Sequence, residues 1–184
     1  GLARLFRDYE VSGYYSYAAN LAGDMVANRP ALRGEATFRS FWSADAMVSV
    51  SGAAWDDRLT RGGPRVRVPR RWSVDGGVQT DSRRAAVLAV GASVGGDSSG
   101  RRVRAVGMEL DVRPTSAVRL RIEPGYERRT DTDQYVTSAA DPGATTTFGR
   151  RYVFADIDRD ELVVEPRADW TFTPRLSLEL FAQP

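Results

Sequence analysis

The chain contains no cysteine, no histidine and no lysine among its 184 residues. Without cysteine it can hold neither a disulfide framework nor a thiolate metal site. Without histidine it lacks the commonest general base near neutral pH and the commonest metal ligand, so enzymatic roles fall to carboxylates, Tyr, Ser, Thr or Arg. The longest apolar stretch, near Ala85 to Ala92, is far shorter than the ~20 residues of a membrane-spanning helix. These absences exclude a helical membrane protein.

Charge is abundant but balanced. The 26 basic residues are all arginine, and 24 carboxylates lie in the same segments, for a net charge of +2. Nucleic-acid-binding proteins usually segregate basic residues into a stripe or tail, whereas here the two signs interleave. We therefore expect no nucleic-acid partner.

The most informative pattern is a strict alternation of apolar and charged residues, clearest in Val118-Arg119-Leu120-Arg121-Ile122-Glu123. A strand sends successive side chains to opposite faces, so one face here is apolar and the other ionised. The alternation recurs around Val106 to Arg113 and Glu161 to Trp170. A sheet with lipid on one side and water on the other is built in this way.

The pattern predicts an all-β fold, namely an antiparallel up-and-down meander of about nine strands that forms part of a transmembrane β-barrel in the bacterial outer membrane, with lipid as a partner. We treat 1–184 as a single segment of that barrel and expect its remaining strands to lie outside this chain. The predicted strands are 4–17, 32–42, 46–55, 72–80, 84–95, 102–113, 117–128, 152–172 and 176–183. Residues 152–161 are expected to extend above an apolar band that begins near Leu162.

Short and long joins are expected to alternate, as in barrels with short turns at one end and longer loops at the other. The short joins are Ser43-Ala44-Asp45, Asp81-Ser82-Arg83, Pro114-Thr115-Ser116 and Thr173-Pro174-Arg175, and the others are 18–31, 56–71, 96–101 and 129–151. Aromatic residues lie beside both kinds of join, as two interfacial girdles would require.

A ladder of charged residues is predicted to line the lumen. If Val112 pairs with Val118, Asp111 faces Arg119 and Glu109 faces Arg121, so neighbouring strands present opposite charges. Such pairs hold the register of a polar interior; the alternative is that they line a permeation path. The ladder comprises Glu109, Asp111, Arg113, Arg119, Arg121, Glu123, Glu165, Arg167 and Asp169.

Metal and catalytic roles are weakly supported. Asp156 to Glu161 resembles the start of a calcium loop, but its sixth position is Glu161 instead of glycine, and Asp131 and Asp133 are similarly ambiguous. A carboxylate dyad such as Glu165 with Asp169 would suit glycoside hydrolysis, yet each candidate carboxylate has an arginine on the same face, which opposes the protonated form of a general acid. We predict no metal, no cofactor and no catalytic residue.

Four stretches resemble a known family: 57–64 (DRLTRGGP), 134–136 (QYV), 148–158 (FGRRYVFADID) and 170–178 (WTFTPRLSL). They are similar to the DUF5916 proteins of Gram-negative-type bacteria, over nearly the whole chain. The resemblance implies a carbohydrate-linked envelope protein in which a sugar-binding module, similar to carbohydrate-binding module family 9, precedes an outer-membrane barrel. That module would lie outside this chain. The motif residues expected on one rim of the barrel are Asp57, Arg58, Arg61, Gly62, Gly63, Arg150, Arg151, Tyr152, Asp156 and Asp158.

Three hypotheses therefore remain open. The favoured one is a non-enzymatic barrel segment that anchors or acts with a glycan-binding module, or passes polar solutes. The second is an outer-membrane hydrolase of glycosyl bonds with carboxylates near residues 129–161. The third is a soluble β-sandwich or lipocalin-like binding domain.

Overall fold

The structure, a computed structural model, describes residues 4–183 and consists almost entirely of β-strands. The strands are β1 (Phe6–Ala19), β2 (Met25–Phe38), β3 (Ser43–Ser51), β4 (Ala54–Asp56), β5 (Val66–Val68), β6 (Arg71–Gln79), β7 (Ala86–Asp97), β8 (Arg102–Thr115), β9 (Val118–Ala140), β10 (Arg150–Thr173) and β11 (Leu176–Phe181). A single turn of 3-10 helix, η2, covers Thr145–Thr147. The described residues contain no helix long and apolar enough to cross a bilayer.

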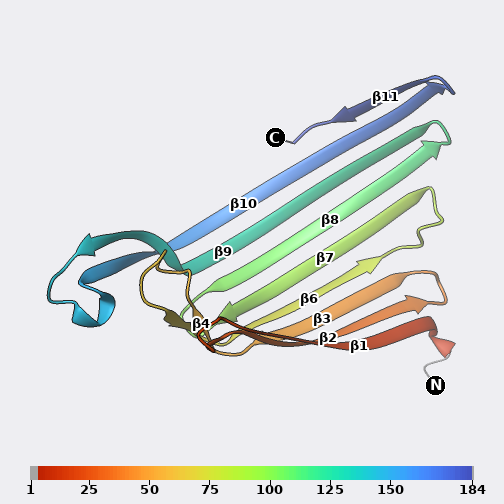
Figure 1. Cartoon of the computed structure of the whole chain (residues 1–184). Coiled ribbons are helices and arrows are strands. Elements are labelled where there is room, and N and C mark those ends of the chain that lie inside the picture. The colour runs from red at the N-terminus through yellow and green to blue at the C-terminus, as the bar shows by residue number, and fades with distance from the viewer. Residues whose placement is uncertain (1–3, 184) are drawn as a thin grey trace.

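Nine of these strands form one antiparallel sheet in the order β1-β2-β3-β6-β7-β8-β9-β10-β11, while β4 and β5 pair separately (Figure 1). The predicted nine-stranded meander is confirmed. The alternation that predicted it works because the pleat of a strand puts every second side chain on one face. Within the described residues the sheet is not closed, since the outer edges of β1 and β11 have no strand neighbour.

The joins sort to the two ends of the sheet. The turns at 39–42, 80–85, 116–117 and 174–175 lie at the right-hand end in Figure 1, which we call the turn end. The joins at 20–24, 52–70, 98–101 and 141–149 lie at the other, which we call the arm end. The prediction of strictly alternating short and long joins was wrong, because 98–101 is shorter than the turn at 80–85.

Several predicted boundaries were also wrong. The turn placed at Ser43-Ala44-Asp45 lies at 39–42, where Phe41 adopts a φ of 64°, and Ser43 already begins β3. The predicted loop 18–31 is mostly strand, because β2 starts at Met25. The predicted strand 46–55 ends at Ser51, and Trp55 belongs to β4. In each case the apolar alternation weakens at the boundary, so the pattern alone does not locate it.

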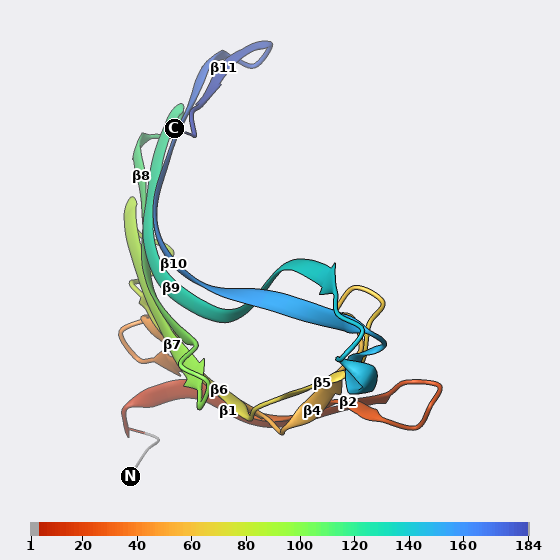
Figure 2. The same ribbon diagram turned by 90° about the vertical axis from the view of Figure 1, so that its left-hand side faces the viewer.

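The largest difference lies at 129–151, which was predicted as a loop. Instead β9 continues to Ala140, and β10 begins at Arg150. The pairing of β8 with β9 ends at Arg102 and Thr130, so residues 131–140 pair only with β10. We call residues 131–157 the arm. The arm has two register shifts, at Val153/Phe154 and Ala155/Ile157, and such bulges bend a β-ribbon. Figure 2 shows it crossing the concave side of the curved sheet toward β4.

Within the described residues no second layer of protein covers the convex side of the sheet, and the only buried apolar residues are Ala31 and Ala54. A soluble domain of this length would bury a sizeable core between two layers. The fold therefore places nearly all of its side chains on one of two open faces.

Candidate functional site

The exposure of side chains on the two faces of the sheet is the reverse of that in a soluble protein, because large apolar side chains are exposed and a charged side chain is buried. Residues directly opposed across neighbouring strands share a face, and the apolar members form continuous rows such as Leu88, Leu110 and Ile122. Leu120 and Ile122 remain 44% and 39% exposed, whereas Asp111 on the opposite face is only 5% exposed. The exposed apolar face includes Leu32, Val48, Val74, Val78, Leu88, Val90, Val106, Met108, Leu120, Ile122, Leu162, Trp170, Leu178 and Leu180. We call it the convex face and its opposite the concave face.

The apolar rows of the convex face have a defined height. On β9 they run from Val118 to Tyr126, and the next row toward the arm contains Arg104, Arg128 and Asp160. At about 3.4 Å per residue in an antiparallel strand, the apolar part of β9 is roughly 27 Å long. Exposed aromatic side chains mark both limits: Trp170 stacks on Phe172 at the turn end with 4.8 Å between ring centroids, and Tyr126 lies at the arm end.

On the concave face, Asp111 is the centre of an ion-pair network at the turn end. Arg119 donates two hydrogen bonds to its Oδ2, Arg121 Nη2 lies 3.4 Å from the same atom, and Arg113 Nε lies 3.5 Å from Oδ1. The distance from Arg121 Nε to Glu109 Oε1 is 3.4 Å. The predicted contacts of Asp111 with Arg119 and of Glu109 with Arg121 are therefore present.

The register assumed for those contacts was nevertheless wrong. Val112 pairs with Leu120, and Thr115 pairs with Val118 after a register shift, so Asp111 stands directly opposite Arg121. Arginine side chains are long enough to reach carboxylates diagonally across the ladder, which explains how the contacts survive a different register.

The remaining predicted ladder residues continue this face. Arg121 Nη1 lies 3.6 Å from Glu123, and Arg167 Nη2 lies 3.7 Å from Glu165. Asp169 stands opposite Arg119 in the pairing of β10 with β9. The ladder is thus assembled across β8, β9 and β10 as one charged surface.

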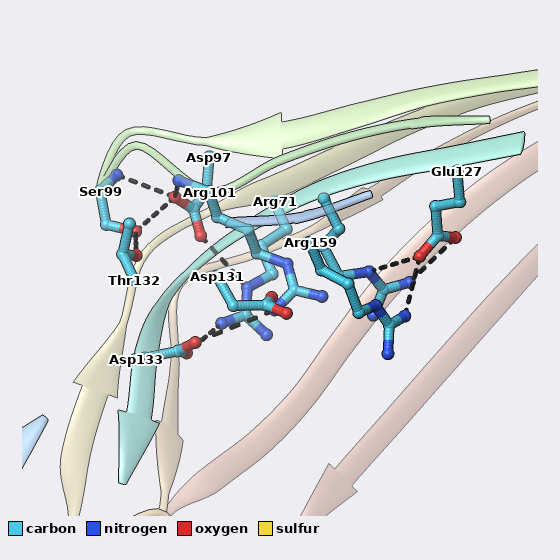
Figure 3. Close-up of polar contacts among 10 residues, drawn as sticks. Arg71, Asp97, Ser99, Arg101, Glu127, Asp131, Thr132, Asp133 and Arg159 are labelled. Carbon is cyan, nitrogen blue, oxygen red and sulfur yellow. Dashed lines mark hydrogen bonds and ion pairs between the residues drawn. The ribbon is translucent and has the colours of Figure 1, made fainter. Parts of the chain in front are cut away.

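A second network at the arm end was not identified as a unit from the sequence (Figure 3). Arg71 Nη2 of β6 lies 2.7 Å from Asp133 Oδ2 of the arm, and its Nε donates to Asp97 Oδ2 at 3.3 Å. Arg101 Nη1, in the β7–β8 turn, lies 2.5 Å from Asp131 Oδ1. The side chain of Asp97 is fully buried among these groups. We call the two contacts of Arg71 with Asp133 and Arg101 with Asp131 the latch.

The contact of Arg71 with Asp133 joins strands that are not neighbours, because β7 and β8 lie between β6 and β9. The contact of Arg101 with Asp131 lies one residue beyond the last pair of β8 and β9, Arg102 with Thr130. The arm can reach Arg71 only by folding over the tip of the β7–β8 hairpin, where Ser99 Oγ and Thr132 Oγ1 are 2.8 Å apart. On the same face, Arg159 and Arg129 both pair with Glu127, at 3.1 and 3.0 Å. The sequence did contain one signal for the latch: Asp131 and Asp133 share one face if the strand that became β9 extends this far.

The 52–70 loop contacts the arm through residues of the family-like motifs. The guanidinium of Arg61 lies 4.9 Å from the centre of the Tyr135 ring, and a Cβ added to Gly63 would overlap the ring of Tyr152. Gly62 has a φ of +98°, which favours glycine. The structure therefore brings Arg61 close to Tyr135, and Gly63 close to Tyr152.

The other motif residues make separate pairwise contacts. Asp57 accepts a hydrogen bond from Asn20 at 3.3 Å and lies 3.9 Å from Arg58. Arg150 donates to Ser138 at 2.8 Å, Arg151 pairs with Asp141, and Thr130 donates to Asp158 at 2.6 Å. Asp156 is exposed. These residues stabilise turns and the arm but do not converge on one centre.

Two of the hollows on the concave face lie near the centre of the sheet and the latch. The larger, of about 820 Å³, follows a row of glycines paired across four strands: Gly77, Gly91, Gly107 and Gly125. Its walls carry seven carboxylates and two arginines: Asp45, Asp75, Glu109, Glu123, Glu127, Glu161 and Glu165, with Arg129 and Arg159. Because a glycine has no side chain, the row keeps the middle of the face open.

The smaller hollow, of about 420 Å³, lies beside the latch and has a different character. We call it the arginine–serine hollow; its lining includes Arg29, Arg71, Arg101, Arg129, Ser49, Ser51, Ser73 and Ser93, together with Asp75 and Glu127. The hydroxyls of Ser49 and Ser73 are 2.9 Å apart.

Two carboxyls in the joins are perturbed by arginine. Hydrogen bonds from Arg83 lower the pKa of Asp81 to about 2, against burial that acts to raise it. The hydrogen bond from Arg65 holds the pKa of Asp24 below its usual range. Both groups are held in the charged form by their partners.

Among residues 4–183 no group of three or more Asp or Glu side chains is arranged to hold a metal ion. Comparison of the chain with protein-family models, with curated proteins and with solved structures finds no match. The resemblance to the DUF5916 family thus remains a prediction from the motif residues.

Proposed function

We propose that this chain is part of the wall of an outer-membrane β-barrel, with lipid against the convex face and water against the concave face. The observation that carries the proposal is the inverted exposure of the two faces. Large apolar side chains such as Leu120 and Ile122 are exposed over the whole convex face, while the charged side chains opposite are paired.

The energetics favour lipid as the neighbour of the convex face. Exposed apolar surface costs about 25 cal/mol per Å² in water, and patches on soluble monomers seldom exceed a few hundred Å². The apolar rows extend across the sheet from Leu32 to Leu180. Their height on β9 is of the same order as the ~25 Å apolar band of transmembrane barrels.

The concave face supports the same proposal from the other side. Its arginine–carboxylate pairs include partners that are one-quarter to one-half exposed, such as Arg121 and Glu109, so the face is suited to a wet lumen. The unpaired edges of β1 and β11 would then be closed by further strands of the same protein, because an open edge exposes unpaired backbone groups.

The arm narrows one end of this lumen in the proposed arrangement. Together with the 52–70 loop it crosses the concave side at the arm end (Figure 2). The biological role we propose, following the family resemblance, is an envelope anchor that acts with a glycan-binding module outside this chain, and a wall along which polar solutes pass.

The orientation of the two faces can be tested with spin labels. This chain has no cysteine, so single substitutions add one labelling site to it. In the full-length protein in liposomes, labels at Leu120→Cys and Ile122→Cys should be relaxed by oxygen, which partitions into lipid. A label at the intervening Arg121→Cys should be relaxed by a water-soluble nickel complex. Equal access of the nickel complex to all three sites would refute the proposal.

A further inference from the structure

The arginine–serine hollow has the chemistry of a site for oxyanions. Its arginines are planar forks that match the two oxygens of a carboxylate or phosphate, and its serine hydroxyls add further donors. It lies on the concave face, lined by residues of β2, β3, β6, β7, β8 and β9, and it includes Arg71 and Arg101 of the latch.

Two of the guanidinium groups in the hollow, those of Arg71 and Arg101, already bind carboxylates of the arm. Arg71 holds Asp133 at 2.7 Å, and Arg101 holds Asp131 at 2.5 Å (Figure 3). These carboxylates belong to a segment with no β8 neighbour, so little besides the latch, the Ser99–Thr132 contact and the 52–70 loop retains them. They stand where the oxyanion of a ligand would stand.

A third arginine of the hollow has no such occupant. Arg29 of β2 donates from Nε to Ser51 Oγ at 3.1 Å, and no ion pair joins it to any carboxylate of the residues that the structure describes. Its fork therefore offers an anchoring point that does not depend on movement of the arm.

We propose that the arginine–serine hollow binds the oxyanion group of a polar solute, a carboxylate or phosphate, and that Asp131 and Asp133 of the arm are its built-in competitors. A ligand anchored on Arg29 would compete with Asp133 for Arg71 and with Asp131 for Arg101. Ligand binding would therefore favour release of the arm. The proposal adds a solute class to the proposed function, and rests on that function only in requiring a wet concave face.

Binding can be measured by calorimetry on the full-length protein in detergent, with inorganic phosphate and acetate as probes and chloride at matched ionic strength as the control. Replacing the anchor, Arg29→Gln, should weaken binding about tenfold, the equivalent of one lost charge-assisted contact. Arg29→Lys, which keeps the charge but loses the fork, should weaken it less. Absence of phosphate binding, or unchanged affinity in Arg29→Gln, would overturn the proposal.

The role of the arm gives an independent and opposite signature. Asp133→Asn should tighten phosphate binding, because it removes a competitor. Asp75→Asn is the matched control: it removes a charge from the same hollow but from a residue that does not touch the arm. Both variants should raise the affinity because each removes a negative charge, so affinity alone does not separate them. Only Asp133→Asn should also free the arm.

Arm position can be followed as the distance between spin labels at Arg58→Cys, in the loop, and Val136→Cys, in the arm, both exposed. Phosphate, and separately Asp133→Asn, should lengthen or broaden this distance, whereas chloride and Asp75→Asn should not. A phosphate-bound protein with an unchanged distance would refute competition by the arm. These measurements are made in detergent, so their failure is distinct from failure of the convex labels to meet lipid.

Discussion

The convex and concave faces of the sheet are built from alternate residues of the same strands, yet they are stabilised in different ways. On the convex face no residue of the part of the chain that the structure describes contacts a second protein layer, and Leu120 stays nearly half exposed. On the concave face Asp111 is almost fully buried by arginines. One face thus depends on the solvent that surrounds it, and the other on contacts that the chain makes with itself. Substitutions should therefore act through different physical effects on the two faces.

The largest effect is expected for a charge placed on the convex face. Leu120→Arg puts a guanidinium in the middle of the apolar rows, where a lipid-facing position costs about 2–4 kcal/mol. We expect the full-length protein to fold into liposomes with a correspondingly lower free energy of unfolding in urea. The matched control is Ser93→Arg, which adds the same side chain to the concave face opposite Asp75. Equal losses in the two variants would contradict the difference between the faces.

The next effect concerns the centre of the concave network. Asp111→Asn removes the charge that Arg119 and Arg121 share, and a charge-assisted hydrogen bond contributes about 1.5–3 kcal/mol. Because both arginines are partly exposed, we expect a loss of about 1–2 kcal/mol in the same unfolding assay. Glu179→Gln, in exposed β11, should change stability by less than about 0.5 kcal/mol. A neutral Asp111→Asn would show that the network is not stabilising.

Some features of the two faces could be predicted from the sequence, and others could not. The meander and the Asp111–Arg119 and Glu109–Arg121 contacts followed from alternation and from one local hairpin. The arm did not, because residues 131–140 pair only with β10 and carry no continuous apolar face to reveal a strand. The contact of Arg71 with Asp133 was missed for a topological reason: the two residues lie on strands separated by two others, and no local rule pairs them. The contact of Arg101 with Asp131 was missed because 129–151 was predicted as a loop.

A smaller effect is expected where the arm meets the loop. Arg61→Ala removes the contact with the Tyr135 ring, which at a partly exposed site is worth about 0.5–1 kcal/mol. We expect faster cleavage of the arm in limited proteolysis, by a few-fold, with no change in the urea unfolding of the sheet. Arg58→Ala is the control, since the Arg58 side chain is 96% exposed and touches only its neighbour Asp57. Equal cleavage rates for both variants would show that the Arg61 contact does not hold the arm.

The smallest effect lies at the turn end, outside both faces, and depends on pH. Arg83 donates two hydrogen bonds of 2.8 Å to the Asp81 carboxylate, and the pKa of that carboxyl is lowered from 3.8 to about 2. A depressed pKa means that the carboxylate stabilises the turn fully above about pH 4, and that this contribution is lost as the pH falls through about 2. NMR titration of ¹³C-labelled aspartate, assigned by its loss in Asp81→Asn, should show the low pKa. In an Arg83→Gln variant the pKa should return toward 3.8. Titration of Asp81 near 4 in the unsubstituted protein would mean that the Arg83 clamp does not persist in solution, and that the turn end, like the convex face, depends on its surroundings for order.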